Sequence, residues 1–172
     1  MSILKSITIP EISSTDPDWS REQSSRWWSP SCQLLNSIRG YQKWRVDGGI
    51  IARCLRIYYV VQHRFWSVVT GADIPLNCQI QGGLLLPHPN GVVIHPNASI
   101  GTNCLIFQQV TIVGGVKIGG HVDIGAGAKI ILPVTIGEHA KIGANAVVLS
   151  DVPPGATAVG IPAKIVVNKD LD

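Results

Sequence analysis

Large aliphatic residues recur at every sixth position through the second half of the chain. A small or β-branched residue stands two places before each of them. Because alternate residues of a β-strand face the same side, each pair predicts a short strand with two inward side chains. The aliphatic series is Ile94, Ile100, Ile106, Ile112, Ile118, Ile124, Ile130, Ile136, Ile142 and Val148, and the partners are Val92, Ala98, Cys104, Val110, Val116, Val122, Ala128, Val134, Ala140 and Ala146.

Glycine directly follows the aliphatic residue at several turns of the repeat. If three six-residue sides close one coil, residues eighteen apart stack, and the glycines form such columns. Glycine suits a corner where a positive φ or a close backbone approach would penalise a Cβ. The repeat therefore predicts a triangular parallel β-helix whose ends need caps. The columns are Gly101, Gly119 and Gly137, and then Gly125 and Gly143.

The repeat is interrupted once. Its register runs backward through Ala72/Ile74, Cys78/Ile80 and Leu84/Leu86, and it slips by two residues before Val92. The inserted segment, 87–91, reads Pro-His-Pro-Asn-Gly and holds His88 between two prolines ahead of a turn signal. A single interruption that presents an imidazole on a stiff surface segment invites a functional explanation.

Two helices are predicted before the repeat, at 31–48 and 49–70, where apolar residues follow helical spacing. We expect them to form a small helical cap. The second helix carries Arg53, Arg56 and Arg64 within its apolar run and is a poor transmembrane candidate. Across 31–70, six Lys/Arg against Asp47 alone, together with Trp44 and Trp66, permit weak peripheral membrane contact, but a helix docked on the end of the β-helix explains the same pattern.

Composition agrees with a turn-rich β protein. The chain of 172 residues has 18 Gly, 11 Pro and one Met, and its 45% hydrophobic and 15% charged residues exclude disorder and a coiled coil. We predict an N-terminal segment and cap at 1–70, a β-helix domain at 71–167 and a tail at 168–172.

Charge, the N-terminal sequence and the cysteines indicate which binding partners and which cellular compartment to expect. A net charge of +3 without a Lys/Arg run argues against nucleic acid. The start of the chain lacks the apolar stretch of a signal peptide, which predicts a cytoplasmic protein. Four cysteines more than twenty residues apart argue against zinc and disulfides, so we expect free, mostly buried thiols.

The chain resembles the hexapeptide-repeat acyltransferases of the serine O-acetyltransferase type over residues 16–167. The matching stretches are Ala-Asp-Ile-Pro at 72–75, Leu-Pro-His-Pro-Asn-Gly-Val-Val at 86–93, Gln-Gln-Val-Thr-Ile at 108–112, Ile-Gly-Ala-Gly-Ala-Lys-Ile at 124–130, and Asp-Val-Pro-Pro and Gly-Ile-Pro-Ala-Lys between 151 and 164. The resemblance implies a mainly β fold, a left-handed parallel β-helix with a small N-terminal α-helical cap. It also implies an acetyl-CoA-dependent O-acetyltransferase that serves cysteine biosynthesis.

The resemblance assigns the catalytic pair. His88 would be the general base that takes a proton from the acceptor hydroxyl, and Asp73 would orient it. Asp73 lies between inward Ala72 and Ile74 and so points outward, and the fifteen residues to His88 are close to one coil. Considered alone, each of the two residues is equally explained as a solvated surface side chain without a catalytic role.

The family also implies where the co-substrate binds. CoA lies in a groove between neighbouring subunits, which implies a homotrimer with shared active sites and no metal. The resemblance places backbone contacts at Gly114, Ala126 and Ala144, and Lys141 and Lys164 near the phosphates or adenine. Gly114 and the two alanines also read as plain corners of the coil.

The chain departs from the family in its acceptor region. The N-terminal helical region is short, which favours a lone trimer, and the family's Arg-His-Pro loop after Gly114-Gly115 is missing. The acceptor-binding aspartate falls at Asp18, with Asp16 as the alternative. The tail does not end in isoleucine, so a cysteine-synthase complex is not expected.

These departures leave several functions open. L-serine is the first acceptor, and a sugar hydroxyl in exopolysaccharide biosynthesis is the second. A hypothesis outside the enzymes is a non-catalytic β-helix scaffold. A metal-binding hydratase would need His121, His139 and His95 at one interface. We expect His121 and His139 to form a polar surface column with Asn103, and His95 and His63 to be structural.

Overall fold

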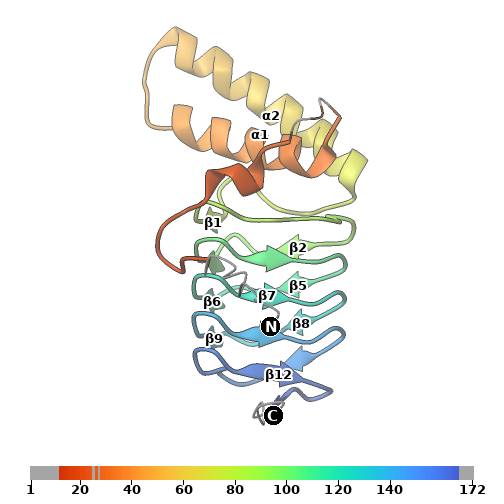
Figure 1. The fold of residues 1–172 in the computed structure, drawn as a ribbon. Helices are drawn as coiled ribbons and strands as arrows, with labels where there is room; N and C mark the ends of the chain where they lie inside the picture. The colour runs from red at the N-terminus through yellow and green to blue at the C-terminus, as the bar shows by residue number, and fades with distance from the viewer. Residues whose placement is uncertain (1–11, 25, 27, 167–172) are drawn as a thin grey trace, which may run out of the picture.

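The computed structural model describes residues 12–24, 26 and 28–166 of the chain. It confirms the predicted fold class: a three-sided β-helix with two helices at its N-terminal end (Figure 1). The helical elements are η1 (Trp19–Glu22), α1 (Pro30–Trp44) and α2 (Ile50–Thr70). The strands are β1 (Gln79–Ile80), β2 (Val93–Ile94), β3 (Ser99–Ile100), β4 (Leu105–Ile106), β5 (Thr111–Ile112), β6 (Lys117–Ile118), β7 (Asp123–Ile124), β8 (Lys129–Ile130), β9 (Thr135–Ile136), β10 (Lys141–Ile142), β11 (Val147–Val148), β12 (Thr157–Val159) and β13 (Lys164–Val166).

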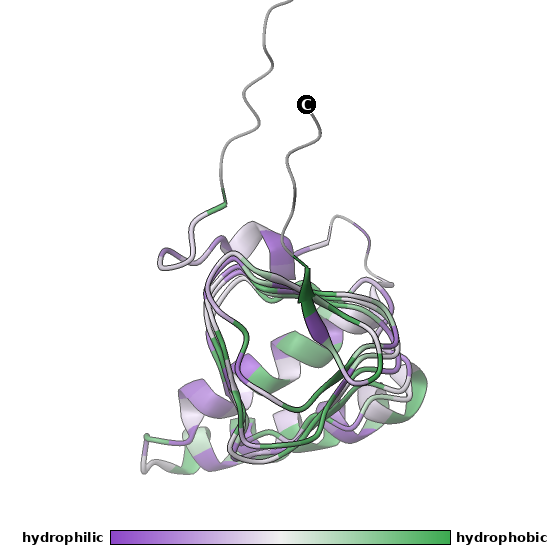
Figure 2. Cartoon of the chain, turned by 90° about the horizontal axis from the view of Figure 1, so that it is seen from below, coloured by the Kyte–Doolittle hydropathy of each residue, from purple (hydrophilic) through white to green (hydrophobic). Residues whose placement is uncertain are grey.

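The strands form three sheets, parallel except for β13, one for each side of the triangle that Figure 2 shows along the axis. Sheet 1 has the order β1-β3-β6-β9, sheet 2 has β4-β7-β10-β12-β13, and sheet 3 has β2-β5-β8-β11. Neighbours pair eighteen residues apart through the middle of the solenoid, as with Ile100 and Ile118 or Ile112 and Ile130. The predicted stacking of three six-residue sides is therefore confirmed.

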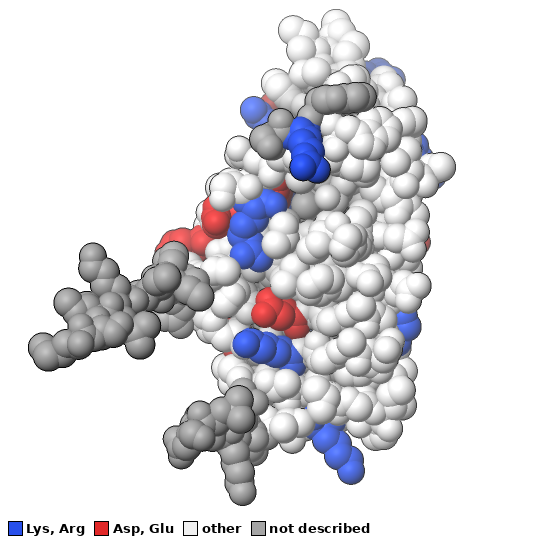
Figure 3. All heavy atoms as spheres, turned by 45° about the vertical axis from the view of Figure 1, so that its right-hand side comes forward, with Lys and Arg blue, Asp and Glu red and all other residues white. Residues whose placement is uncertain are grey.

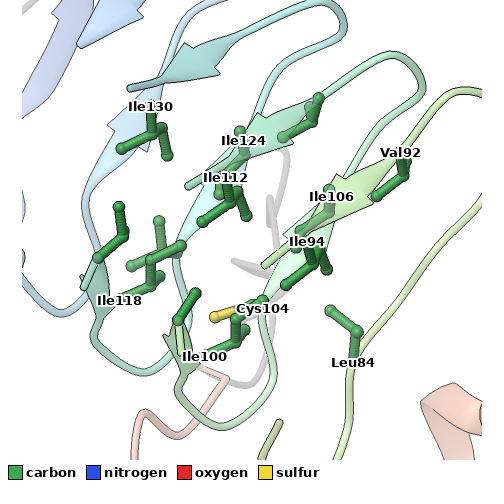
Figure 4. Close-up of a cluster of buried hydrophobic side chains, with 14 of the residues drawn as sticks. Leu84, Val92, Ile94, Ile100, Cys104, Ile106, Ile112, Ile118, Ile124 and Ile130 are labelled. Atoms are coloured by element: carbon green, nitrogen blue, oxygen red, sulfur yellow. The ribbon is translucent and has the colours of Figure 1, made fainter. Parts of the chain in front are cut away.

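The core is the column of inward side chains inside the triangle (Figure 4). Every member of the six-residue series is buried, and so is the small partner two residues before it. Each two-residue strand turns its second residue inward, while the first faces outward with partial or full exposure. Because each side chain contacts those of the coils above and below, the stack stabilises itself from coil to coil.

Two coils differ in length from the rest. Gln79 pairs with Ser99, twenty residues on, and the coil that takes up the extra residues contains the segment 87–91. Lys141 pairs with Thr157, sixteen residues on, which shortens the last coil. The predicted slip of two residues is therefore real, and the solenoid absorbs it at one corner without losing the inward register on either side.

The corner glycines are needed for close approach rather than for a positive φ. A Cβ on Gly101 would lie 2.4 Å from the carbonyl carbon of Gly119, so the next coil occupies the space of a side chain. The positive φ angles fall two residues further on, at Asn103, His121 and His139. Of the two reasons that the sequence offered for glycine, the backbone approach is the correct one for this column.

The helical cap covers the first coil and supplies hydrogen-bond donors to it. Leu34 and Ile38 of α1 are buried against the core, and α1 ends at Trp44 rather than at the predicted residue 48. Arg39 donates to the carbonyls of Ile80 and Gln81 at 2.5 and 2.6 Å. The terminal coil has no strand above it, so these bonds satisfy carbonyl groups that a further coil would otherwise engage.

Further donors complete the same edge. Gln42 bonds to the carbonyls of Leu76 and Cys78, and His63 Nε2 lies 2.8 Å from the carbonyl oxygen of Ile74. At the opposite end, β13 pairs antiparallel with β12 and covers that strand's edge. Both ends of the described solenoid are thus capped, as the repeat architecture requires.

The four thiols are free, as predicted, but only two are buried. Burial raises the pKa of Cys78 to about 12 and that of Cys104 to about 11. Cys32 is partly exposed and Cys54 is exposed on α2, because α2 turns that position away from the core. The expectation of mostly buried thiols is therefore wrong for these two residues. The start of the chain and the tail at 168–172 lie outside the described residues.

Candidate active site

His88 lies at the corner between sheets 2 and 3, on the enlarged coil. Its loop is held by the backbone: the N–H of Gly91 donates to the carbonyl of Gly71, and the N–H of Val92 to that of Pro89, at 2.9 and 3.1 Å. The imidazole itself is exposed and makes no hydrogen bond to any residue that the structure describes. The extra residues thus place a solvent-accessible base on a fixed loop.

Asp73 begins the coil that precedes His88. Its backbone bridges to Val93, so its stacking partner is twenty residues away rather than His88 at fifteen. His88 therefore lies five residues before the position that stacks on Asp73, at the corner that leads into that strand. The Asp73 carboxylate is exposed in a cleft of about 300 Å³ between α2 and the first coil, lined by Val60, His63, Arg64, Pro75 and Leu76.

The two candidate residues lie at the same corner of adjacent coils. Gly71, two residues before Asp73, bonds to Gly91, three residues after His88. Within the described chain, the carboxylate and the imidazole form no direct hydrogen bond or ion pair with each other. Both side chains are solvent-exposed, which leaves them free to turn. Hydrogen bonds of catalytic groups are often long without substrate and shorten in the complex.

Asp16 and Asp18 lie on an N-terminal strap, residues 13–22, which crosses the corner between sheets 1 and 2. Asp18 caps η1: its Oδ1 accepts from the N–H and the hydroxyl of Ser20 at 3.0 and 2.6 Å. The hydrogen bond from the Ser20 hydroxyl is the main reason that the pKa of Asp18 is lowered. Asp16 is exposed, and its N–H bonds to the hydroxyl of Ser13.

Asn103 anchors the strap, a role that sequence reasoning missed. Its side chain is buried; Oδ1 accepts the N–H of Asp18, and Nδ2 donates to the carbonyls of Ser13 and Asp16, each at 2.8 Å. Arg21 adds bonds to the carbonyls of Gly83 and Asn103. The expected surface column is therefore wrong at Asn103, because a segment more than eighty residues away covers it. An asparagine at a left-handed corner position was the available signal.

The histidines that follow in that column contact each other. His121 Nδ1 and His139 Nδ1 lie 2.9 Å apart, and both residues have a positive φ. Burial is the main reason that the pKa of His121 is lowered. His95 lies at another corner, where its Nδ1 accepts the N–H of Asn97 at 3.1 Å. No cluster of three metal-ligating side chains occurs within residues 12–24, 26 and 28–166.

The candidate CoA contacts divide between corners. Ala126 and Ala144 lie at the corner of His88, on later coils, and Gly114 lies at the corner between sheets 3 and 1. Lys141 in β10 and Lys164 in β13 are exposed on sheet 2, toward the C-terminal end. Basic side chains are scattered among uncharged ones on the face shown in Figure 3, without forming a single patch. A larger cavity of about 480 Å³, between α1 and sheet 1, contains none of the candidate residues.

Comparisons with known proteins identify relatives with one activity in common. The chain is 34% identical over 153 residues to serine acetyltransferase of Escherichia coli, covering 84% of this chain and 56% of the relative. It is 39% identical over 123 residues to serine acetyltransferase of Helicobacter pylori, covering 66% of this chain and 72% of the relative. The chain thus spans little more than half of the Escherichia coli relative. No family model matches it.

Solved structures similar to this chain are serine acetyltransferases as well. Soybean serine acetyltransferase in complex with serine is 38% identical with a TM-score of 0.67, covering 81% of this chain and 58% of that one. A serine acetyltransferase in complex with CoA is 33% identical with a TM-score of 0.68 at the same coverage. At these sequence identities, the likeness indicates a shared family and not only a shared fold.

Proposed function

The chain belongs to the serine acetyltransferase family, and on that premise we propose that it transfers the acetyl group of acetyl-CoA to an acceptor hydroxyl, with L-serine as acceptor and O-acetylserine as product. The observation that carries the proposal is the single enlarged coil, which exposes His88 at the corner it shares with Asp73. A solenoid gains nothing in packing from two extra residues at one corner, so a chemical role explains them better.

His88 acts as the general base. Its neutral imidazole accepts the proton of the acceptor hydroxyl while the hydroxyl oxygen attacks the thioester carbonyl carbon. The tetrahedral intermediate then collapses, the C–S bond breaks, and the imidazolium returns the proton to the departing CoA thiolate. The products are the O-acetyl ester and free CoA, and the histidine ends the cycle neutral. No metal takes part in this scheme.

Asp73 is a positioning residue for His88. A carboxylate that accepts a hydrogen bond from the second ring nitrogen sets the tautomer and stabilises the imidazolium that forms. Exposure of both side chains at one corner leaves room for this contact to form when substrate fills the cleft. General-base catalysis of this kind contributes about 10²–10⁴-fold to the rate.

Acetyl-CoA lies along the corner of His88. Ala126 and Ala144 follow His88 along that corner, and their small side chains let a ligand approach the backbone. Lys141 and Lys164 lie several coils further on, about 5 Å per coil, where they would meet the phosphates and adenine of an extended ligand. The acetyl group would then sit at the capped end beside His88 and Asp73.

The acceptor site is shared between subunits of a homotrimer. His88 and the strap carrying Asp18 lie at different corners of one chain, because the strap binds at Gly83. Gly83 lies in the turn before the sheet 2 side of this coil and His88 in the bend after it, five residues and at most about 16 Å apart. L-serine is too small to bridge that distance, so Asp18 or Asp16 of one subunit would meet His88 of the next. Gly114, at a third corner, would contact CoA held by a neighbour.

One observation favours a sugar hydroxyl as the second candidate acceptor. The corner from Val113 to Val116 closes as an ordinary turn, with the N–H of Gly115 bonded to the carbonyl of Asn97 at 3.2 Å. It therefore has no inserted loop to bring a cation to an amino-acid carboxylate. A sugar acceptor needs no such partner. We place either reaction in the cytoplasm, where four free thiols fit the reducing conditions.

Release of CoA thiol from acetyl-CoA tests these proposals. We expect turnover with L-serine, loss of turnover in His88→Ala, and unchanged turnover in Lys117→Ala, an exposed residue of sheet 1. Turnover with sugars alone would replace L-serine by the glycan acceptor. No turnover with either, and no effect of His88→Ala on any acceptor, would leave the scaffold reading.

A further inference from the structure

The outer face of α2 is a continuous apolar stripe, defined here as the α2 face. Its residues recur every three or four positions, so they lie on one side of the helix. Ile50 is 85% exposed, Val68 84% and Val61 62%, although these side chains would normally be covered. The α2 face consists of Ile50, Cys54, Ile57, Val61, Phe65 and Val68.

Docking on the β-helix does not account for this face. α1 docks through Leu34, Leu35 and Ile38, which are buried in the core. α2 contacts the solenoid only through its C-terminal half, where Trp66 joins the core and His63 lies against the carbonyl of Ile74. α2 packs on α1, and Gly40 of α1 leaves the space that the ring of Tyr59 occupies. Only Ala52, Trp66 and Thr70 of α2 are buried. Docking on the solenoid therefore explains Trp66 and His63 but leaves the α2 face uncovered. For that face, peripheral membrane contact is the other explanation that the sequence allows.

The charged residues of α2 itself are all positive. Arg53 and Arg56 line the same shallow recess as Ile57 and Val61. Arg64, eleven residues after Arg53 on the same flank, also lines the cleft of the Asp73 carboxylate, so Arg53 and Arg56 carry the charge argument. Neither α1 nor α2 contains an acidic residue, and the one carboxylate between residues 30 and 70 is Asp47, on the connecting loop. An apolar stripe with a cationic flank complements an anionic lipid surface.

A second copy of the chain fits this face less well. If two α2 faces met about a twofold axis, each would bring its arginines to the other, without an acidic residue on either helix to pair with them. The like charges would lose water without gaining a partner. Anionic lipid headgroups instead pair with arginines while the acyl region takes the apolar side chains.

We propose that the α2 face binds the surface of an anionic membrane, with the helix lying in the headgroup layer. α2 has 21 residues, which is about 31 Å of helix along the membrane plane. No described helix is long and apolar enough to span a bilayer, so the contact is peripheral. Because the cap forms one end of the solenoid (Figure 1), binding would place the corner of His88 and Asp73 beside the membrane and the later coils away from it.

Flotation of the full chain with vesicles tests the proposal. We expect binding to vesicles of phosphatidylcholine with equimolar phosphatidylglycerol, weaker binding to phosphatidylcholine alone, and release by salt. The double variant Val61→Ser, Val68→Ser should bind at least tenfold more weakly. Its matched control, Ile131→Ser with Leu132→Ser, changes two residues of 45% exposure at another corner and should bind as wild type does. Arg53→Gln should weaken binding to anionic vesicles about fivefold.

Cys54 reports on the same face directly. A polarity-sensitive fluorophore attached to Cys54 in a Cys32→Ser background should brighten with anionic vesicles, while buried Cys78 and Cys104 stay unlabelled. The proposal would be overturned if the protein did not bind vesicles, or if the double variant Val61→Ser, Val68→Ser bound them as tightly as wild type. It would also be overturned if the chain self-associated without vesicles and the Val61→Ser, Val68→Ser variant did not, because a second copy would then cover the α2 face. None of these readouts depends on acetyl transfer.

Discussion

Asn103 Oδ1 accepts the backbone N–H of Asp18 at 2.8 Å, across 85 residues of sequence. The same amide donates to the carbonyls of Ser13 and Asp16, so one buried side chain holds the strap that carries both candidate acceptor residues. The position of these aspartates therefore depends on a corner of the second coil rather than on the strap's own sequence.

Replacing Asn103 should release the strap. Asn103→Gly keeps the left-handed φ of 58° but loses the three side-chain bonds, which should lower the free energy of unfolding by about 2–3 kcal/mol. Asn103→Ala should cost about 1 kcal/mol more, because alanine disfavours that backbone conformation. Urea unfolding measures both. Amide hydrogen exchange at residues 13–18 should rise in each variant, and unchanged protection there would show that Asn103 is not the anchor.

The proposed catalytic pair predicts strong coupling. His88→Ala should lower kcat/KM by about 10²–10⁴-fold, and Asp73→Asn by a smaller factor, because the carboxylate acts through the histidine. The double variant should be no slower than His88→Ala, since Asp73 has no partner once the imidazole is gone. Multiplicative losses in the thiol-release assay would mean that the two residues act independently.

Corner glycines should tolerate no side chain. Gly101→Ala would set a Cβ against the backbone of Gly119 in the next coil, where no flexible group can move aside. We expect the free energy of unfolding to fall by about 3 kcal/mol or more, in the range of strong overpacking. Gly48→Ala is the matched control, because nothing lies within 4 Å of its added Cβ. Equal thermal midpoints for the two variants would contradict the close-approach explanation.

The histidine pair predicts a pH dependence of stability. Because the folded protein holds the pKa of His121 below 6.5, mainly through burial, the unfolded chain binds the proton more readily. This contribution to stability is present above about pH 6.5 and is lost as the pH falls through the folded pKa. The loss between pH 7.5 and 5.5 should be smaller in His121→Asn, which keeps a residue tolerant of the φ of 53°. An identical pH profile of urea midpoints in both proteins would refute it.

Local periodicity was enough to predict the solenoid. The alternation of Val110 and Ile112, repeated every six residues, has no stable placement other than a narrow shared core. Glycines at the same column positions predicted the stacking of Gly101 on Gly119. The insertion at 87–91 was visible for the same reason, because any departure from a strict repeat is local information.

The burial and the contacts of each outward-facing residue could not be predicted from the repeat. Outward positions such as Asn103, His121 and Asp73 look equivalent in the repeat, because each simply points away from the core. Asn103 is buried by the strap, His121 lies against His139, and Asp73 is exposed in a cleft under α2. These differences arise from segments that pack across the coils.

By itself, the sequence determined the three-sided coil, its inward register, the enlarged corner at His88 and the helical character of the cap. Only the tertiary structure decided that α2 contacts the solenoid through Trp66 and His63, which leaves the apolar α2 face exposed. It also decided that Asn103 positions Asp16 and Asp18 at a different corner from His88. The physical reason is the range of the interactions. Strand periodicity is set by neighbours along the chain, whereas burial of an outward residue depends on distant segments that no local pattern specifies.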